Sequence, residues 1–385
     1  MATLKSFTAW LVKVPLLEEW ASSPEYGPHS SGPPRLILRL VDDEGTVGWG
    51  EGGTTLDAAS LSESLSQLPG TELQANRLSL LDLHASPTYW HQPTFPSPFQ
   101  PDAAKIRHRL RHPLQNAVEM ALLDLTARRA GVPLCHLFGG AWRDWVAVDY
   151  WMGRVSPEHA GRCVRRAREL GFNGLKLKTT LEDPNVERLE AIKAEGGADF
   201  HVTVDANGRF YRLDDALSTL GAMDRVGNMR ILEDPFPRHD YAACAALRGR
   251  ISARTVAHID PPESLLAVLQ QGAVGGLNLD SHVQGLWGWR MQASVADAFN
   301  LPVWHGSGLD LGIATAAQLH LAAATPNCEL PGDQAGPWLR EADLLQTRLS
   351  VQDGAIQVPS GPGLGIEVDR VQIERYATAH FSSEP

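Results

Sequence analysis

The sequence predicts an α/β protein built around a closed parallel barrel, and three features of the chain support this. From residue 146 onward, eight short β-rich runs alternate with helix-like stretches, which calls for a parallel sheet. Eight strands are enough to close such a sheet into a barrel. Most of the runs also end on an ionisable side chain. A doubly wound open sheet is the alternative, but it requires a glycine-rich turn after its first strand, and DYWMGRVSPE is not one.

The first part of the 385-residue chain has a different pattern. KSFTAWLVKV and PRLILRLVDDEG alternate as strands, with DDEG as a hairpin turn. Residues 56–140 are mainly helical, and LQNAVEMALLDLTARRAG keeps helical spacing up to a glycine stop. We therefore expect an α+β domain over residues 1–140 and the barrel over residues 141–340. Strand-like runs return in residues 341–385, which we expect to pack back on the first domain.

A loop over residues 17–34 separates the two N-terminal strands. It is rich in Ser, Pro and Gly, yet it carries Trp20, Tyr26 and His29. A long loop with aromatic residues inside a compact domain is typical of a lid or binding loop, and a plain linker is the alternative. We interpret it as a lid, with Tyr26 and His29 as substrate-binding candidates.

Composition and charge exclude several classes of protein. The net charge of −11 argues against a nucleic-acid partner, because it repels phosphate. The four cysteines show no CxxC spacing, so neither a disulfide framework nor a zinc site is indicated. No apolar run approaches the roughly 20 residues that cross a bilayer. A secretory leader needs an uninterrupted apolar core, and Lys13 and Pro15 interrupt the apolar run near the N-terminus. We expect a cytoplasmic protein without a membrane or nucleic-acid partner.

Polar side chains stand at the ends of successive β-rich runs, about one βα unit apart. In chain order they are Lys176 and Lys178, Asp205, Glu233, His258 with Asp260, Asp280, His305 and Glu329. The carboxyl ends of barrel strands converge on one mouth, so these residues form one ring. A single Asp or His at a strand end is usually a helix cap or a satisfied core residue. So many buried ionisable groups cannot all be structural, because each one costs desolvation energy.

The ring divides by chemistry into two sides. Asp205 and Glu233 could bind a divalent cation through oxygen, as Mg²⁺ requires, with a third ligand from the next strand. Lys176 and Lys178 lie two residues apart on one face of their strand, and a cationic neighbourhood lowers a lysine's pKa so that one amine can act as a base. On the other side, a carboxylate at one ring nitrogen of a histidine would fix its tautomer for proton transfer.

Seven motifs, taken together, resemble the enolase superfamily, of the mandelate racemase type, over nearly the whole chain. They are VGWGE, AVEMALLDLTARRAGVPLCHLFGG, KLK, VDANG, LEDPFP, LNLD and WHGSG. The resemblance implies a modified TIM barrel of the (β/α)7β type with a capping domain built from both termini. It also implies Mg²⁺, which holds the substrate carboxylate and stabilises the enediolate formed when a base removes the α-proton.

The resemblance assigns a role to each matching position. It implies Lys178 as the base, Lys176 as its electrostatic partner, Asp205 and Glu233 as metal ligands, Asn207 and Glu329 as substrate contacts, and His305 with Asp280 as the acid/base dyad on the opposite face. The third ligand departs from the family pattern of Glu or Asp. His258 needs the smallest alignment shift, Asp260 is the runner-up, and if neither binds, the metal site is weak or absent. His282 is an unplaced extra, either a specificity residue or a solvated one.

Two reactions follow from a lysine on one face and a histidine on the other. A small acid sugar, as the substrate carboxylate, would lose water to give a 2-keto-3-deoxy acid, and we favour this lyase activity. Racemisation or epimerisation of a 2-hydroxy acid, an isomerase activity, is the alternative. Asp280 argues against the lactonising and dipeptide-epimerising branches, which carry lysine at that place. A catalytically silent binding homologue is the third hypothesis, and the family implies a homo-oligomer, a dimer or octamer.

Overall fold

The computed structural model describes residues 3–17, 34–53, 58–72, 113–238, 240–259 and 264–383. The expected lid residues Tyr26 and His29 lie outside these ranges, and so does Asp260, the alternative third metal ligand. Within the described part of the chain, none of the helices combines the length and apolarity needed to cross a membrane.

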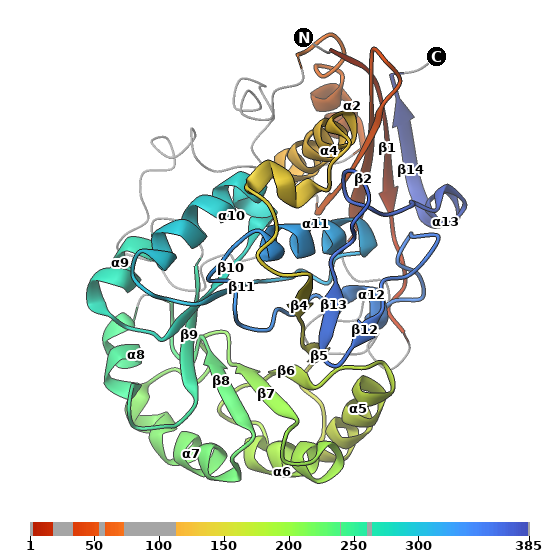
Figure 1. The fold of residues 1–385 in the computed structure, drawn as a ribbon. Coiled ribbons are helices and arrows are strands. Elements are labelled where there is room, and N and C mark those ends of the chain that lie inside the picture. Colours follow the sequence, from red (N-terminus) through yellow and green to blue (C-terminus); the bar gives the residue numbers. More distant parts are fainter. Residues whose placement is uncertain are drawn as a thin grey trace.

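An antiparallel sheet forms the N-terminal capping domain (Figure 1). Its strands are β1 (Leu4–Val12), β2 (Arg35–Asp42) and β3 (Val47–Gly53), and β14 (Ala377–Ser382) pairs with β1 at the far edge. Helix α4 (Pro113–Ala130) packs closely on β3 because Gly48 and Gly50 have no Cβ atoms. A Cβ atom at either position would meet the backbone of the helix. The short helix α2 (Ala58–Leu65) adds Leu61 and Leu65 to the same apolar core.

Seven parallel strands form the wall of the second domain, in chain order across the sheet. They are β5 (Tyr150–Met152), β6 (Gly174–Lys178), β7 (His201–Asp205), β8 (Met229–Glu233), β9 (Arg254–Ile259), β10 (Gly276–Leu279) and β11 (Val303–His305). Residues 327–332 fill the remaining place. Val303 N donates to Asn327 O at 2.8 Å on one side, and Asp149 N donates to Gly332 O at 2.7 Å on the other. The ring therefore closes, and the predicted modified TIM barrel is confirmed.

Helices cover the outside of the barrel (Figure 1). They are α5 (Pro157–Glu169), α6 (Asn185–Gly196), α7 (Leu213–Val226), α8 (Tyr241–Leu247), α9 (Ser264–Gln271), α10 (Ser281–Asp297) and α11 (Gly312–Ala323). Each buries an apolar face, as α5 does with Cys163 and Val164. Every residue of α11 is buried, because this helix contacts β3 of the capping domain as well as the barrel strand β11.

Short elements connect the barrel to the capping domain. A 3-10 helix η2 (Leu134–Phe138) follows α4, and α12 (Gly336–Leu339) follows the eighth barrel segment. The chain beyond residue 341 contacts both domains. Strands β12 (Val351–Gln352) and β13 (Ala355–Gln357) form a small sheet with β4 (Trp145–Ala147) at the barrel entry, and α13 (Arg370–Tyr376) leads into β14. The boundaries of the three predicted segments stay predictions.

Candidate active site

Lys176 is the centre of a buried charge cluster at the carboxyl ends of β6, β7 and β8. Its ammonium nitrogen lies 3.1 Å from Asp205 Oδ2, 2.7 Å from Glu233 Oε2 and 3.0 Å from Asp333 Oδ2. The Lys176 side chain is only 4% exposed, and Asp205 and Glu233 are fully buried. The cluster brings three predicted site residues together and adds Asp333, which the sequence analysis missed.

Lys178 lies above this cluster and is more open. Its side chain is 17% exposed, and its Nζ lies 2.5 Å from Asp205 Oδ2 and 3.0 Å from Asn207 Oδ1. Asn207 has a left-handed backbone with φ 46°, and its backbone N–H donates to Asp205 Oδ1 at 2.9 Å. The predicted base and the predicted substrate-contacting asparagine are therefore adjacent, with the amine of Lys178 partly accessible.

The pKa shifts follow from the unequal surroundings of these groups. Burial and the negative charge of Asp205 raise the pKa of Glu233 to about 7. Burial also disfavours charge on Asp205, but the two ammonium groups outweigh it and hold the pKa of that carboxyl far below its usual range. Burial lowers the pKa of Lys176, yet the carboxylates of Asp333, Glu233 and Asp205 raise it well above its ordinary value. The three carboxylates therefore keep Lys176 charged, as an electrostatic partner of the base must be, and that role stays a prediction.

Asp205 and Glu233 fit a divalent cation. They are register neighbours on β7 and β8, and they present carboxylate oxygens, which Mg²⁺ prefers. Burial of Glu233 beside Asp205 raises its pKa, and a bound cation would offset both effects.

His258 has a different partner from the one expected. Its Nδ1 lies 4.0 Å from Glu233 Oε1 and 3.1 Å from Arg238 Nη2. A guanidinium only donates, so the lone pair of Nδ1 faces Arg238. Ligand atoms of Glu233, Asp234 and His258 lie within 4.8 Å of one another, but Arg238 Nε already contacts Asp234 Oδ2 at 2.8 Å. Metal ligation through Nδ1 would require Arg238 to withdraw, and the third ligand stays a prediction.

Two polar side chains of the mouth were not predicted. Asn278 on β10 is buried and donates to Glu233 Oε1 at 2.6 Å. Asp333 contacts Lys176, whereas Glu329 is exposed and no contact joins it to this cluster in the described part of the chain. Asp333 takes the place expected for Glu329 because the eighth barrel segment runs through Gly332 before it reaches the mouth. Leu330 N bonds Val303 O at the start of β11, so Glu329 lies near the amino-terminal end of the barrel and Asp333 at the mouth.

The predicted hydrogen bond between Asp280 and His305 is absent in the structure. The neighbouring Trp304 packs in the barrel interior with Ile231 and Val256, and side chains alternate along a strand. His305 therefore faces the helix layer, where its ring stacks on Trp289 at a centroid distance of 5.3 Å. Its Nδ1 lies against Gly306 O, and burial lowers its pKa. The catalytic role of His305 stays a prediction, without the expected dyad geometry.

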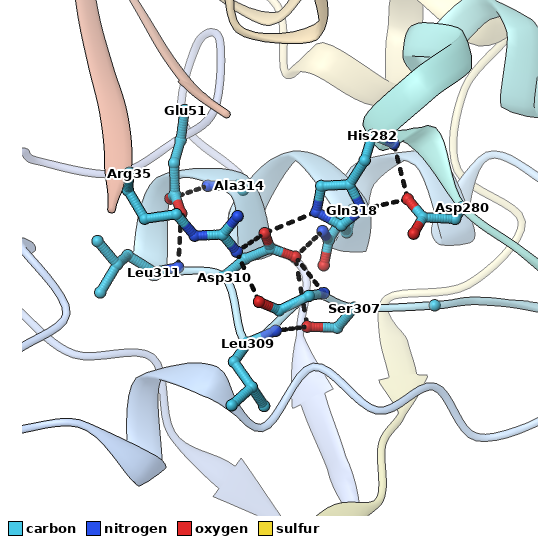
Figure 2. A network of polar contacts seen from close by, with 12 residues as sticks. Arg35, Glu51, Asp280, His282, Ser307, Leu309, Asp310, Leu311, Ala314 and Gln318 are labelled. Atoms are coloured by element: carbon cyan, nitrogen blue, oxygen red, sulfur yellow. Dashed lines mark hydrogen bonds and ion pairs between the residues drawn. The ribbon is translucent and has the colours of Figure 1, made fainter. Parts of the chain in front are cut away.

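Asp280 is paired with His282 instead (Figure 2). Asp280 is the N-cap of α10, and its Oδ1 accepts from the backbone amide of His282 at 2.7 Å and from the ring Nδ1 of the same residue. His282 is buried, which excludes the solvated alternative from the sequence analysis. The second side of the mouth therefore holds an Asp–His pair made of neighbours along the chain.

Comparisons with known proteins agree with this fold. The family model described as Enolase C-terminal domain-like matches residues 159–372. Muconate cycloisomerase 1 of Rhodococcus opacus is 30% identical over 268 residues, covering 66% of this chain and 69% of the relative. A probable glucarate dehydratase of Streptomyces coelicolor is 28% identical over 387 residues, covering 92% and 86%. The crystal structure of N-succinyl Arg/Lys racemase from Bacillus cereus superposes with a TM-score of 0.81 at 18% identity, covering 99% and 100%, which shows the fold alone.

Proposed function

Because the chain belongs to the mandelate racemase/muconate lactonizing enzyme family of the enolase superfamily, we propose that it removes the proton α to a substrate carboxylate in a Mg²⁺-dependent reaction. Lys178 is the base. The observation that carries this proposal is the pair of amines on β6, with Lys176 buried among carboxylates and Lys178 partly open above them. Only an accessible amine can reach a substrate proton, and Lys178 is the more exposed of the two.

The other residues of the cluster have supporting roles in this proposal. Asp205 and Glu233 would hold the Mg²⁺, which when bound supplies positive charge to the substrate carboxylate and to the negative charge that develops on proton removal. Asp333 and Glu233 fix the ammonium group of Lys176 below Lys178. Asn207 orients Lys178 through its side-chain oxygen at 3.0 Å.

Dehydration of an acid sugar to a 2-keto-3-deoxy acid is the reaction we propose. Lys178 takes the α-proton, the bond between the β-carbon and its hydroxyl group breaks, and the hydroxide leaves as water with a proton from the Lys178 ammonium group. The enol that remains then tautomerises to the keto acid. Two observations support dehydration: position 280 holds an aspartate rather than a lysine, and the chain is similar over most of its length to a probable glucarate dehydratase. Racemisation or epimerisation of a 2-hydroxy acid is the second candidate. Racemisation needs a second base on the face opposite Lys178. Asp280 favours it, because its carboxylate follows β10, four strands across the barrel from the lysines of β6.

Proton NMR of acid sugars incubated with the protein and MgCl₂ in D₂O tests the proposal. Dehydration gives a 2-keto-3-deoxy acid, and racemisation gives deuterium at the α-carbon without a keto product. Lys178→Ala should stop both. Calorimetry with MgCl₂ addresses the silent-homologue hypothesis, since absence of Mg²⁺ binding together with absence of exchange would contradict our proposal.

Compartment and assembly are also proposals. All four cysteines are free and buried, which supports a reducing compartment such as the cytoplasm. The partner we propose is a small carboxylate, in a homo-oligomer whose size stays open.

A further inference from the structure

A row of buried charged side chains joins the capping domain to the barrel mouth (Figure 2). We call it the cap–mouth network, and its members in order are Glu51, Arg35, Asp310, His282 and Asp280. The first two come from β3 and β2 of the capping domain, and the last three follow β10 and β11 of the barrel. The proposed proton abstraction by Lys178 uses none of the first four.

His282 is the link between two carboxylates. Its Nδ1 contacts Asp280 Oδ1, and its Nε2 lies 2.7 Å from Asp310 Oδ1. An ionised carboxylate only accepts, so both ring nitrogens carry protons and the ring is an imidazolium. Burial lowers the pKa of His282, but the negative charges of Asp280 and Asp310 outweigh burial and raise it well above its ordinary value.

Asp310 is held from the capping side. Arg35 pairs with it through Nη2, which also donates to Gly308 O at 3.0 Å, and Gln318 Nε2 donates to Asp310 Oδ2 at 2.8 Å. Arg35 Nε lies 3.6 Å from Glu51 Oε1. Glu51 in turn accepts from the amides of Leu311 at 2.7 Å and Ala314 at 2.9 Å, at the start of α11. The position of His282 therefore depends on contacts that cross between the two domains.

Asp280 is the only end of the cap–mouth network that is open. Its side chain is 22% exposed, against 2% for His282 and 1% for Asp310. Its Oδ1 is taken up by His282, and among the described residues no hydrogen bond reaches its Oδ2. The imidazolium of His282, with His258 and His305 at longer range, holds the pKa of Asp280 well below its usual range against the effect of burial.

We propose that His282 is a positioning residue, anchored through Asp310 and Arg35 in the capping domain, that fixes the Asp280 carboxylate as the acceptor for a hydroxyl group of the substrate. This inference rests on the proposed function and names the substrate class of that site: a carboxylate that carries hydroxyl groups. An ionised carboxylate accepts hydrogen bonds and cannot donate them, so it selects a donor on the side of the mouth opposite Lys178.

Binding calorimetry in the Lys178→Ala background tests the inference, because bound sugar is then not turned over by the proposed base. The probes are a panel of hexonates and hexanoate, which has the same chain length without hydroxyl groups. We expect the best hexonate to bind at least about tenfold more tightly than hexanoate, and His282→Gln to remove most of this preference while hexanoate affinity stays unchanged.

The matched control is His201→Gln. His201 also pairs with an aspartate, Asp149, at 2.7 Å, but at the first residue of β7, the opposite end of the barrel. It should leave the hexonate preference intact. A second readout is pH: in His282→Gln the remaining preference should disappear at a higher pH than in the parent, because without the imidazolium Asp280 takes up a proton more readily. If His282 had a purely structural role, the pH at which the hexonate preference disappears would be the same in the variant and in the parent.

Two results would overturn the inference: absence of a hexonate preference in the Lys178→Ala parent, or a preference of unchanged size after His282→Gln. Failure of the proposed function is distinguishable, because it is measured separately as α-proton exchange by the unmodified protein. A His282-dependent preference without exchange would reject the reaction and keep the positioning role. Should His282→Gln fail to fold, Asp280→Asn takes its place and is expected to lose the same preference.

Discussion

The two sides of the barrel mouth hold their charged groups in different ways. On the β6–β8 side, Lys176 pairs with Asp205 and Glu233 inside the barrel, and all three residues lie on strands. On the β10–β11 side, Asp280 lies beyond the strand end and depends on a chain of contacts that reaches Arg35 and Glu51 in the capping domain. The first side is therefore a property of the barrel alone, and the second is a property of how the two domains pack.

The largest effect is expected on the lysine side. Lys178→Ala should lower kcat for α-proton exchange by about 10³-fold or more, because general bases contribute roughly 10²–10⁴-fold. Lys178→Arg is the matched control: it keeps the charge, but guanidinium does not give up a proton, so it should be as inactive as the alanine variant. Substantial exchange by the arginine variant, measured by NMR, would show that Lys178 supplies charge and not basicity.

The contact across the domains should dominate stability. Arg35→Met leaves Glu51 buried without its cationic partner and Asp310 with His282 as its remaining one. Breaking a buried ion pair in this way typically costs about 3–5 kcal/mol of unfolding free energy. Arg154→Met is the control, because Arg154 pairs with Asp183 while 29% exposed and should cost about 1 kcal/mol or less. Urea denaturation of both variants measures the difference. Equal losses would indicate that the cap–mouth network does not hold the domains together.

The pH dependence of stability should separate His282 from the lysine side. The folded-state pKa of His282 is raised, so the folded protein holds this proton more tightly than the unfolded chain. Its contribution is therefore fully present below the unfolded pKa of about 6.5 and is lost as the pH rises toward the folded value. Thermal unfolding from pH 6 to 9 should show the parent and His282→Gln converging as the pH rises. A gap that stays constant would place the neutral ring, not the imidazolium, in the network.

The smallest effect is expected at His305. Because its ring stacks on Trp289 in the helix layer, His305→Asn should lower kcat by about threefold or less, with some loss of packing stability. Asp280→Asn is the comparison, since it removes the open carboxylate and should cost at least about tenfold in substrate affinity. Steady-state kinetics on one acid sugar decides between them. Loss of all chemistry in His305→Asn would instead support the dyad first predicted from the sequence.

The sequence predicted the fold and three members of the lysine side. The alternation of β-rich runs and helices specifies a barrel, and strand ends meet at its mouth, so Lys176, Asp205 and Glu233 could be placed together by counting. The same counting placed Glu329 where Asp333 lies, because the eighth segment continues through Gly332 and spacing alone does not report where a strand stops.

The second side could not be predicted in this way. Whether His305 points inward depends on the phase of a three-residue strand, and a shift of one residue moves a side chain to the other face. The pairing of His282 with Asp310 depends on the course of the chain after β11 and on Arg35 from a distant strand. One local signal existed: Asp280 and His282 have the two-residue spacing of an N-cap and its partner amide at the start of α10.

The most direct test of the central claim is α-proton exchange of an acid sugar in D₂O with MgCl₂, followed by NMR for the parent protein and for Lys178→Ala side by side. We predict deuterium incorporation or keto-acid formation by the parent and neither by the variant. Equal exchange by the two proteins would contradict a lysine base on β6.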